Sequence, residues 1–170
     1  MRRITMIVVA AVALVLVASS VFVYNAYGSG TVEIKITDPP KWGQATQVYL
    51  NYSSIELHRA DAGNESGWFT IVDKSAWINL TKVLNVNQTI GYKSLQAGLY
   101  NLIRFQISDA IVTVAGKNYT ATVPSGKLQI TITKGGIRIT TGQTAALLID
   151  LETKVEGSYM IAPDVRAVPM

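Results

Sequence analysis

Residues 98–123 read GLYNLIRFQISDAIVTVAGKNYTATV, and this stretch decides the fold. Its first half alternates between an apolar face formed by Leu99, Ile103, Phe105 and Ile107 and a second face formed by Tyr100, Arg104 and Gln106. A period of two is typical of a half-buried β-strand. We expect a turn at Ser108–Asp109 and then a hairpin, in which residues 111–114 pair with residues 119–123 across a loop at 115–118. The stretch therefore predicts a central ribbon on which the other elements pack.

The chain on either side of this ribbon repeats the same pattern in short pieces. Alternating segments separated by turn residues occur at 32–36, 48–57, 68–72, 128–132, 137–139, 147–151 and 159–168. About eight to ten short strands at regular spacing are typical of an antiparallel β-sandwich. We therefore expect an all-β fold with an immunoglobulin-like or transthyretin-like body.

Three places depart from simple alternation. The apolar positions change phase between Tyr52 and Ile55, which predicts a β-bulge near Ser53–Ser54. Residues 75–85 fit either a helical turn or a strand with a bend. Pro163 lies inside the last expected strand, and it favours an edge position or a bulge because proline cannot donate a ladder hydrogen bond.

An uncharged apolar run occupies residues 4–24, directly after Arg2 and Arg3. A helix of this length spans about 31 Å at ~1.5 Å per residue, which matches a hydrocarbon core of ~30 Å. Two arginines precede the run and no basic residue follows until Lys35, so we expect the N-terminus in the cytoplasm and the remainder outside. The chain is therefore predicted to attach to a membrane through residues 4–24.

The sequence leaves open whether this helix is retained or removed. A signal peptide usually has a shorter apolar region of about 7–15 residues. Small residues spaced as at cleavage sites nevertheless occur at Ala18/Ser20 and at Ala26/Gly28. We divide the chain into a signal anchor or signal peptide at 1–27, a linker at 28–30 and an extracytoplasmic β-sandwich domain at 31–168. The expected location is the cell membrane, with a single span and the C-terminal domain outside the cytoplasm, or the exterior after cleavage.

Charge and cysteine content exclude several functions. The 15 basic and 11 acidic residues give a net charge of +4, and leaving out Arg2 and Arg3 reduces it to +2. Basic residues do not cluster after that point, so we expect no nucleic-acid surface. The chain has no cysteine, which rules out disulfides, thiolate metal sites, a cysteine nucleophile and a lipoprotein anchor. No cofactor is implied.

Acceptor motifs for N-linked glycans are unusually frequent. With 8 asparagines and 27 serines and threonines in 170 residues, chance predicts about 1.3 such motifs. Five occur, at Asn51, Asn64, Asn79, Asn87 and Asn118. Asn64 and Asn118 are the best candidates because they fall in expected loops. The alternative is that a β-rich chain simply places asparagine and threonine near turns and on solvated faces.

The case for catalysis is weak. His58 is the only histidine, it shares a strand face with Glu56, and we expect it at a solvated strand end. A Ser-His-Asp triad would require the fold to bring a serine and an acid to this one residue.

Asp150 and Glu152 are two residues apart on one expected strand face. Such a pair could bind Ca²⁺ if loop oxygens joined it, although cross-strand pairing with arginine or lysine is the more ordinary role. Arg104 and Arg166 are natural ion-pair partners for Asp150 or for Asp164. No other residues suggest a metal site.

Aromatic residues offer a route to ligand binding. The chain has three tryptophans and eight tyrosines, and rings of this kind can bind sugars. We expect Trp68 and Trp77 to fill the core. Trp42, which follows Pro39-Pro40-Lys41, is expected to be exposed and is the candidate ligand-binding aromatic.

A set of short motifs occurs in order along the chain. They are Ile36-Thr37-Asp38-Pro39-Pro40, residues 48–58 ending in IELH, Gly67-Trp68, residues 97–100 with Ile103-Arg104, residues 123–126, residues 148–151, and residues 161–163 with Val165-Arg166. Together they resemble the family known as domain of unknown function 4382, over residues 31–168. The resemblance implies an extracytoplasmic β-sandwich of a prokaryotic surface protein and no activity. Many bacterial members look like lipoproteins, whereas this chain has an apolar helix in place of the anchoring cysteine.

Three functions remain in competition. The first is a membrane-anchored, non-enzymatic cell-surface domain that binds or scaffolds, in contact with a surface glycan or an envelope protein. The second is a filament subunit that self-associates by strand donation, with residues 32–36 of one copy completing the sheet of the next. The third is a hydrolase that uses His58, Asp150 and Glu152.

Overall fold

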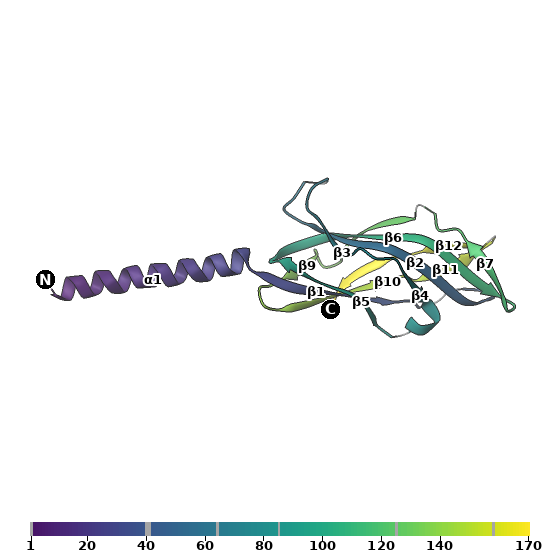
Figure 1. The fold of residues 1–170 in the computed structure, drawn as a ribbon, viewed down its shortest axis with the longest axis horizontal. Helices are drawn as coiled ribbons and strands as arrows, with labels where there is room; N and C mark the ends of the chain where they lie inside the picture. The colour runs from purple at the N-terminus through teal and green to yellow at the C-terminus, as the bar shows by residue number, and fades with distance from the viewer. Residues whose placement is uncertain (1, 40–41, 64, 85, 125, 158) are drawn as a thin grey trace.

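The computed structural model describes residues 2–39, 42–63, 65–84, 86–124, 126–157 and 159–170. A single long helix, α1 (Arg2–Tyr27), projects from one end of an all-β body (Figure 1). Its segment Met6–Tyr24 has a mean hydropathy of 2.9, and none of it is buried against the body. The helix is therefore long and apolar enough to cross a membrane.

Two β-sheets form the body. The smaller sheet has the order β13 (Arg166–Pro169), β10 (Thr144–Asp150), β1 (Ser29–Thr37) and β5 (Gln88–Gln96). The larger sheet has the order β3 (Trp68–Val72), β2 (Ala45–Arg59), β6 (Gly98–Val114) and β7 (Lys117–Ala121), and its further members are β4 (Ala76–Asn79), β8 (Lys127–Thr131) and β9 (Ile137–Ile139). A separate pair, β11 (Thr153–Glu156) and β12 (Met160–Pro163), lies at the end of the body away from the helix (Figure 1).

The core lies between the two large sheets and follows from the period-two patterns. In β1, the buried residues Val32, Ile34 and Ile36 alternate with less buried polar ones. Leu50 on β2 and Phe105 on β6 are buried in the same cluster. The predicted all-β sandwich behind an N-terminal helix is confirmed. One ladder, between β1 and β10, is parallel, while the other paired strands run antiparallel.

The strands are more numerous and less uniform than expected. Thirteen strands are found in the described part of the chain, against about eight to ten in the prediction. Two of them, β2 with 15 residues and β6 with 17, are long. Several others, such as β9 with three residues, are too short to give a clear alternation.

The central stretch is one continuous strand, and the predicted turn at Ser108–Asp109 is wrong. Asn51 pairs with Asp109 and Tyr52 with Ile107, so Ser108 is an extra residue that forms a bulge in β6. The Ser108 hydroxyl donates to the Asn51 carbonyl at 3.2 Å. Residues that often form turns are accommodated here on the exposed face of a strand.

Two further bulges set the phase of the long strands. The predicted bulge near Ser53–Ser54 is confirmed, because the pairing skips Ser53 in β2. Asn101 is skipped in β6, which reverses the alternation ahead of it. As a result Tyr100, expected on the solvated face, is fully buried, and its hydroxyl donates to the Gln96 carbonyl at 3.0 Å.

Local turns and the ambiguous segment are also defined. The β6–β7 hairpin closes through Ala115 and Gly116 alone, both at positive φ (49° and 75°), as a type I′ turn requires. The loop is therefore tighter than the predicted 115–118. In the segment 75–85, strand β4 leads into a short 3₁₀ helix, η1 (Leu80–Val83), so both readings hold in part. Residue 85 lies outside the described residues.

The helix joins the sandwich with almost no linker. α1 ends at Tyr27 and β1 begins at Ser29, so the expected linker at 28–30 is reduced to Gly28. The Tyr24 carbonyl accepts from the Gly28 N–H at 2.9 Å and from the Thr141 hydroxyl at 3.2 Å, and the Gly28 carbonyl accepts from Ala97 N–H at 2.8 Å. A Cβ at position 28 would lie 2.3 Å from Thr141 Cγ2. The end of the helix is hydrogen-bonded directly to the body.

Candidate functional site

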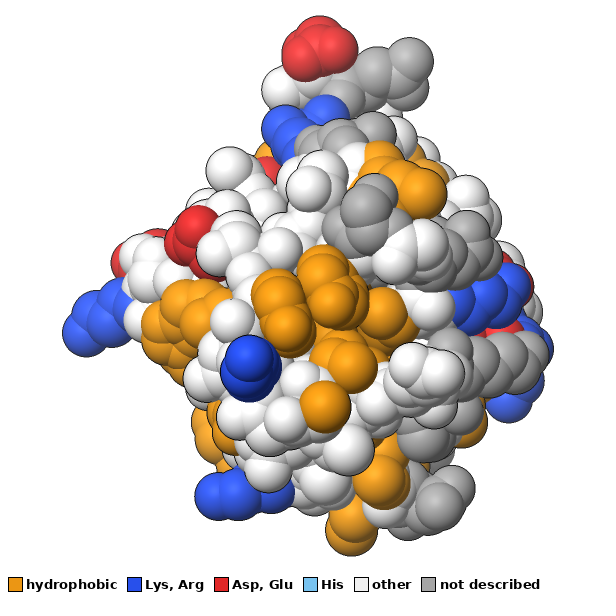
Figure 2. Space-filling model, turned by 90° about the vertical axis from the view of Figure 1, so that its right-hand side faces the viewer, with side chains coloured by type: hydrophobic (Ala, Val, Ile, Leu, Met, Phe, Trp, Pro, Cys, Tyr) orange, Lys and Arg blue, Asp and Glu red, His pale blue; other side chains and the backbone are white. Residues whose placement is uncertain are grey.

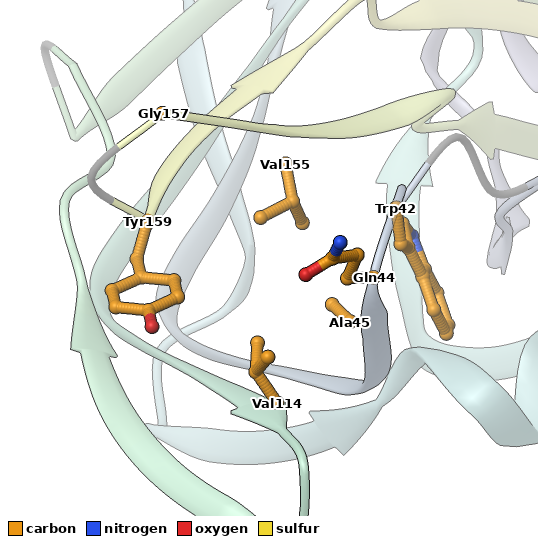
Figure 3. A pocket seen from close by; sticks show the side chains of 7 residues that line it. All are labelled: Trp42, Gln44, Ala45, Val114, Val155, Gly157 and Tyr159. Atoms are coloured by element: carbon orange, nitrogen blue, oxygen red, sulfur yellow. The ribbon is translucent and has the colours of Figure 1, made fainter.

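A pocket of about 270 Å³ opens at the end of the body opposite α1. Its lining residues are Trp42, Gln44, Ala45, Val114, Val155, Gly157 and Tyr159 (Figure 3). They come from three places: the start of β2 and the loop before it, the end of β6, and the β11–β12 hairpin. Figure 2 looks at this end of the molecule, where hydrophobic side chains gather near the centre and most charged ones lie nearer the edge.

Trp42 forms one side of the pocket, and a buried carboxylate holds it in place. Its indole Nε1 donates to Asp38 Oδ2 at 3.2 Å, and the backbone N–H of Thr153 donates to Asp38 Oδ1 at 2.7 Å. Trp42 is only 8% exposed, so the prediction of an exposed ring is wrong. The physical reason is that a buried carboxylate needs hydrogen-bond donors, and the indole N–H supplies one of them.

Asp38 lies just after β1 and is completely buried. Burial raises the pKa of its carboxyl group to about 6, and the negative charge of Asp150 acts in the same direction. The hydrogen bonds from Thr153 and Trp42 oppose the shift without cancelling it. This carboxyl group is therefore poised to titrate near neutral pH.

Tyr159 forms the opposite side of the pocket (Figure 3). Its ring stacks on Tyr119 of β7, with a centroid distance of 4.4 Å and an angle of 19° between the planes. Its backbone has φ of +60°, a left-handed conformation that is costly for a residue with a large side chain. The Thr122 N–H donates to the Tyr159 carbonyl at 3.1 Å, which ties this turn to the strand end of β7.

The side chains that line the pocket are neutral in the described part of the chain, and polar backbone and amide atoms contribute to its surface as well as apolar ones. Among the described residues, none that lines the pocket carries a charge, and Gln44 supplies an amide that can donate and accept hydrogen bonds. The volume is just below the ~300–1,000 Å³ that is usual for small-molecule sites. The pocket therefore suits one uncharged ring-sized group, held between aromatic and aliphatic walls.

His58, the catalytic candidate, is buried rather than solvated, so that prediction is wrong. It is 3% exposed, and its ring lies 4.8 Å from that of Trp68. Its Nε2 lies 3.0 Å from the Gly63 carbonyl and its Nδ1 lies 3.4 Å from Asn101 Oδ1. The loop after β2 folds over the imidazole. These partners are an amide and a backbone carbonyl, so they give the triad hypothesis no support.

Trp68 and Trp77, both expected to fill the core, lie elsewhere in the structure. Trp68 lies half-buried on the outer face of the larger sheet, where the Arg104 guanidinium sits 3.6 Å from its ring centroid. Arg104 donates to Gln129 at 3.2 Å, so the structure does not pair it with Asp150 or Asp164 as predicted. Trp77 is 51% exposed on β4 and does not fill the core.

Asp150 and Glu152, the candidate Ca²⁺ ligands, stay a prediction. Within those residues, no group of three or more histidine, cysteine, aspartate or glutamate side chains is placed to hold a metal ion. Glu152 accepts from Arg166 at 2.7 Å, so Arg166 pairs with Glu152 in place of the predicted Asp150 or Asp164. Partial burial and the charge of Glu152 raise the pKa of Asp150.

The glycosylation candidates fall in different environments. Asn51 donates to Asp109 at 3.5 Å, and Asn79 caps η1 by accepting from the Thr81 N–H at 2.9 Å. Asn87 and Asn118 are exposed. Asn64 lies outside the described residues. Glycan attachment stays a prediction, and exposure favours Asn87 and Asn118.

The chain has the architecture of a β-sandwich domain that continues directly from one N-terminal apolar helix. A pocket with aromatic side chains in its lining lies at the other end of the sandwich. The chain belongs to the family described as Domain of unknown function (DUF4382), whose profile matches residues 29–162. The resemblance drawn from the sequence motifs is thereby confirmed. Neither the curated proteins nor the solved structures gave a significant match.

Sequence reasoning identified Trp42 but missed the other parts of the pocket. Asp38 and Thr153 are 115 positions apart in the chain, and no local pattern indicates that they meet. The sequence predicts one terminal strand over residues 159–168, and that prediction gives no sign that Tyr159 lies in a turn and lines a pocket. The one available signal was the Asp-Pro-Pro sequence at 38–40, which stops β1 close to Trp42.

Proposed function

We propose that the protein is a membrane-anchored, non-enzymatic binding domain that holds a neutral ring-sized group of an extracytoplasmic ligand, a surface glycan, in the pocket between Trp42 and Tyr159. The observation that carries this proposal is the location of an uncharged aromatic pocket at the end of the body farthest from the apolar helix (Figures 1 and 3). A ligand in front of the membrane would meet this end first.

The choice of a sugar over an ionic ligand rests on the lining. Aromatic and aliphatic side chains pack against the C–H faces of a sugar ring, and the Gln44 amide can bond its hydroxyl groups. A charged ligand would find no opposite charge among those lining residues that the structure describes. The indole N–H of Trp42 is already bonded to Asp38, so it is not available to an ionic ligand.

Binding is tested with the full chain in detergent micelles against an array of neutral and acidic oligosaccharides. We expect neutral oligosaccharides to bind, and Tyr159→Ala to weaken binding at least 10-fold. Trp77→Ala is the matched control, because Trp77 is an exposed aromatic outside the pocket lining, and it should leave affinity unchanged. Loss of binding in Trp77→Ala with retention in Tyr159→Ala would assign the site elsewhere.

Membrane attachment with the body outside the cytoplasm is part of the same proposal. Arg2 and Arg3 before the apolar helix support this orientation. Protease added to intact cells should digest the body and spare the N-terminal segment. Digestion only after lysis would overturn the orientation, and a mature N-terminus near Ser29 would show that the helix is removed.

The filament alternative receives less support from the topology. β1 is paired along both edges within one chain, to β10 and to β5. Donation of residues 32–36 to another copy would require both ladders to break. Because breaking two ladders costs more than breaking one, the topology favours a domain that folds and acts within one chain.

A further inference from the structure

The apolar segment of α1 bears two exposed tyrosines where it approaches the body. Met6–Tyr24 has 19 residues, about 28 Å of helix at ~1.5 Å per residue, which matches a hydrocarbon core of ~30 Å. Tyr24 is therefore expected at the edge of the hydrocarbon, and Tyr27 lies about one turn beyond it. Their side chains are 61% and 72% exposed. Tyrosine is enriched at this level of a membrane, because its ring is apolar and its hydroxyl group can bond to headgroups or water.

A loop far along the chain reaches the same level. Residues 140–143 connect β9 to β10, and the Thr141 hydroxyl donates to the Tyr24 carbonyl at 3.2 Å. A Cβ on Gly142 would lie 3.6 Å from the Tyr24 hydroxyl oxygen. The Gly142 N–H donates to the Ser29 carbonyl at 2.9 Å, so the loop is tied to the start of β1 as well. The 140–143 loop is therefore fixed beside the residue that marks the end of the apolar segment.

The surface of this loop is uncharged and carries hydrogen-bonding groups. Thr140, Gly142 and Gln143 are exposed, and so is Thr144, the first residue of β10. Their hydroxyl and amide groups can both donate and accept hydrogen bonds. Lipid headgroups present phosphate, ester and hydroxyl groups, which are partners for such side chains. Contact of this kind buries no charge of the protein, so it avoids the largest desolvation cost.

We propose that the 140–143 loop, together with Tyr24 and Tyr27, forms a docking surface for the lipid headgroups of the membrane that α1 crosses. The proposal rests on the membrane attachment proposed above. The body then contacts the membrane at two places, through the helix and through a loop that is hydrogen-bonded to it. Two contacts hold the sandwich upright on the membrane, whereas a single flexible tether would let it lie down on one of its sheets.

An upright body carries the pocket away from the lipid (Figure 1). β2 begins at Ala45, which lines the pocket, and ends at Arg59, whose guanidinium donates to Gln96 at 2.6 Å. The neighbouring Ala97 N–H donates to the Gly28 carbonyl, so β2 ends beside the helix junction. Its 15 residues span up to about 50 Å at ~3.3 Å per residue. The pocket therefore opens several tens of ångströms outside the lipid, and its ligand lies beyond the headgroups of the same membrane.

The test places one fluorescent label at a time on the full chain in phosphatidylcholine nanodiscs, where part of the lipid carries a quenching nitroxide on its headgroup. The chain has no cysteine, so a single introduced cysteine takes the label. Gln143→Cys puts the label on the loop, and Lys117→Cys puts it at an equally exposed site on the β6–β7 hairpin, at the other end of the body. We expect quenching about threefold stronger at position 143 than at position 117, because only the loop lies at headgroup level.

A charge variant tests whether the loop touches the headgroups. Thr140→Glu adds a negative charge at an exposed position of the loop. In nanodiscs that contain anionic phosphatidylglycerol, this charge should be repelled and should reduce quenching at position 143 by about half, because charges interact within a Debye length of ~10 Å. Thr120→Glu, at an exposed position of β7, is the matched control and should leave the quenching unchanged, since it lies far from the lipid.

Two results would overturn the docking surface. One is equal quenching at positions 143 and 117, and the other is quenching at position 143 that Thr140→Glu leaves unchanged. If Gln143→Cys does not fold, Thr144→Cys repeats the measurement at the next exposed position. Loss of α1, seen as a lower mass of the purified chain, would contradict the membrane attachment itself. A retained α1 with an unquenched loop contradicts only the docking surface, so the two failures are distinguishable.

Discussion

The two ends of the sandwich are fastened in different ways. At the helix end, α1 joins β1 through Gly28, with backbone groups bonded to backbone and no space for a side chain. At the pocket end, side chains around Asp38 hold a small hairpin with left-handed residues at both turns. The helix end is therefore held by backbone hydrogen bonds, whereas the pocket end depends on the hydrogen bonds of one buried carboxylate.

The difference comes from which groups make the bonds. Ladder ends and adjacent turns bring backbone N–H and C=O groups together at fixed distances, and these groups do not titrate in the physiological range. A carboxylate bonded to an indole and an amide depends on its protonation state. Substitution should therefore disturb the helix end by steric conflict and the pocket end by charge or backbone strain.

The largest effect is expected at the helix junction. In Gly28→Val, the new Cβ would meet Thr141 Cγ2 at 2.3 Å and the Tyr24 carbonyl at 2.4 Å. Crowding of this kind should lower the free energy of unfolding by about 3 kcal/mol, measured by chemical denaturation in micelles. Gly63→Ala is the matched control, because its Cβ has only a 3.5 Å contact. Equal stability of the two variants would show that the junction is not tightly packed.

A smaller effect is expected from pH, and it should arise at the pocket end. The folded chain raises the pKa of Asp38 to about 6 and also raises that of Asp150, so it retains protons that the unfolded chain has released. Stability contributed by these groups therefore falls as the pH rises from about 4 to about 6. We expect the melting temperature to drop by about 3 °C or more between pH 5 and pH 7.

Asp38→Asn should flatten most of this pH dependence, whereas Gly28→Val should keep its slope and lie lower throughout. A melting temperature that rises between pH 5 and pH 7 in the unmodified protein would contradict a raised pKa for the buried carboxyl group of Asp38.

The smallest effect is a stabilisation in the β6–β7 turn, near the pocket. Ala115 adopts φ of +49°, which a type I′ turn requires and which asparagine tolerates better than alanine. Ala115→Asn should raise the free energy of unfolding by about 0.5 kcal/mol. Lys117→Asn, placed beside the turn in β7, is the control and should be neutral or slightly destabilising. A destabilised Ala115→Asn would mean that the turn has another geometry.

Much of the sandwich could be predicted because strands with one buried face have a period of two. That pattern located the core faces of β1, β2 and β6, and a phase change in it revealed the bulge at Ser53. The bulge at Ser108 was mistaken for a turn, since serine and aspartate favour both. The sequence gives no indication of the bulge at Asn101. A single extra residue in a strand can be recognised only from the pairing with the neighbouring strand.

The candidate site could be predicted only in part, for a related reason. The sequence makes Trp42 a candidate ligand-binding aromatic, which stays a prediction. Its burial depends on Asp38, whose own need for donors appears only when the sheets pack. His58 was misplaced on the solvated side because the loop that covers it comes from later residues and has no periodic pattern. Contacts between residues far apart in the chain are set by register and packing, which local sequence does not encode.

The direct continuation of α1 into β1 has a mechanical consequence. A tethered protein that grips a ligand at its far end is pulled between two points, and tension from the membrane enters the sandwich through Ser29. β1 is flanked by β10 and β5, and both ladders lie along the strand on which the force acts (Figure 1). Their hydrogen bonds are sheared together instead of being unzipped one after another.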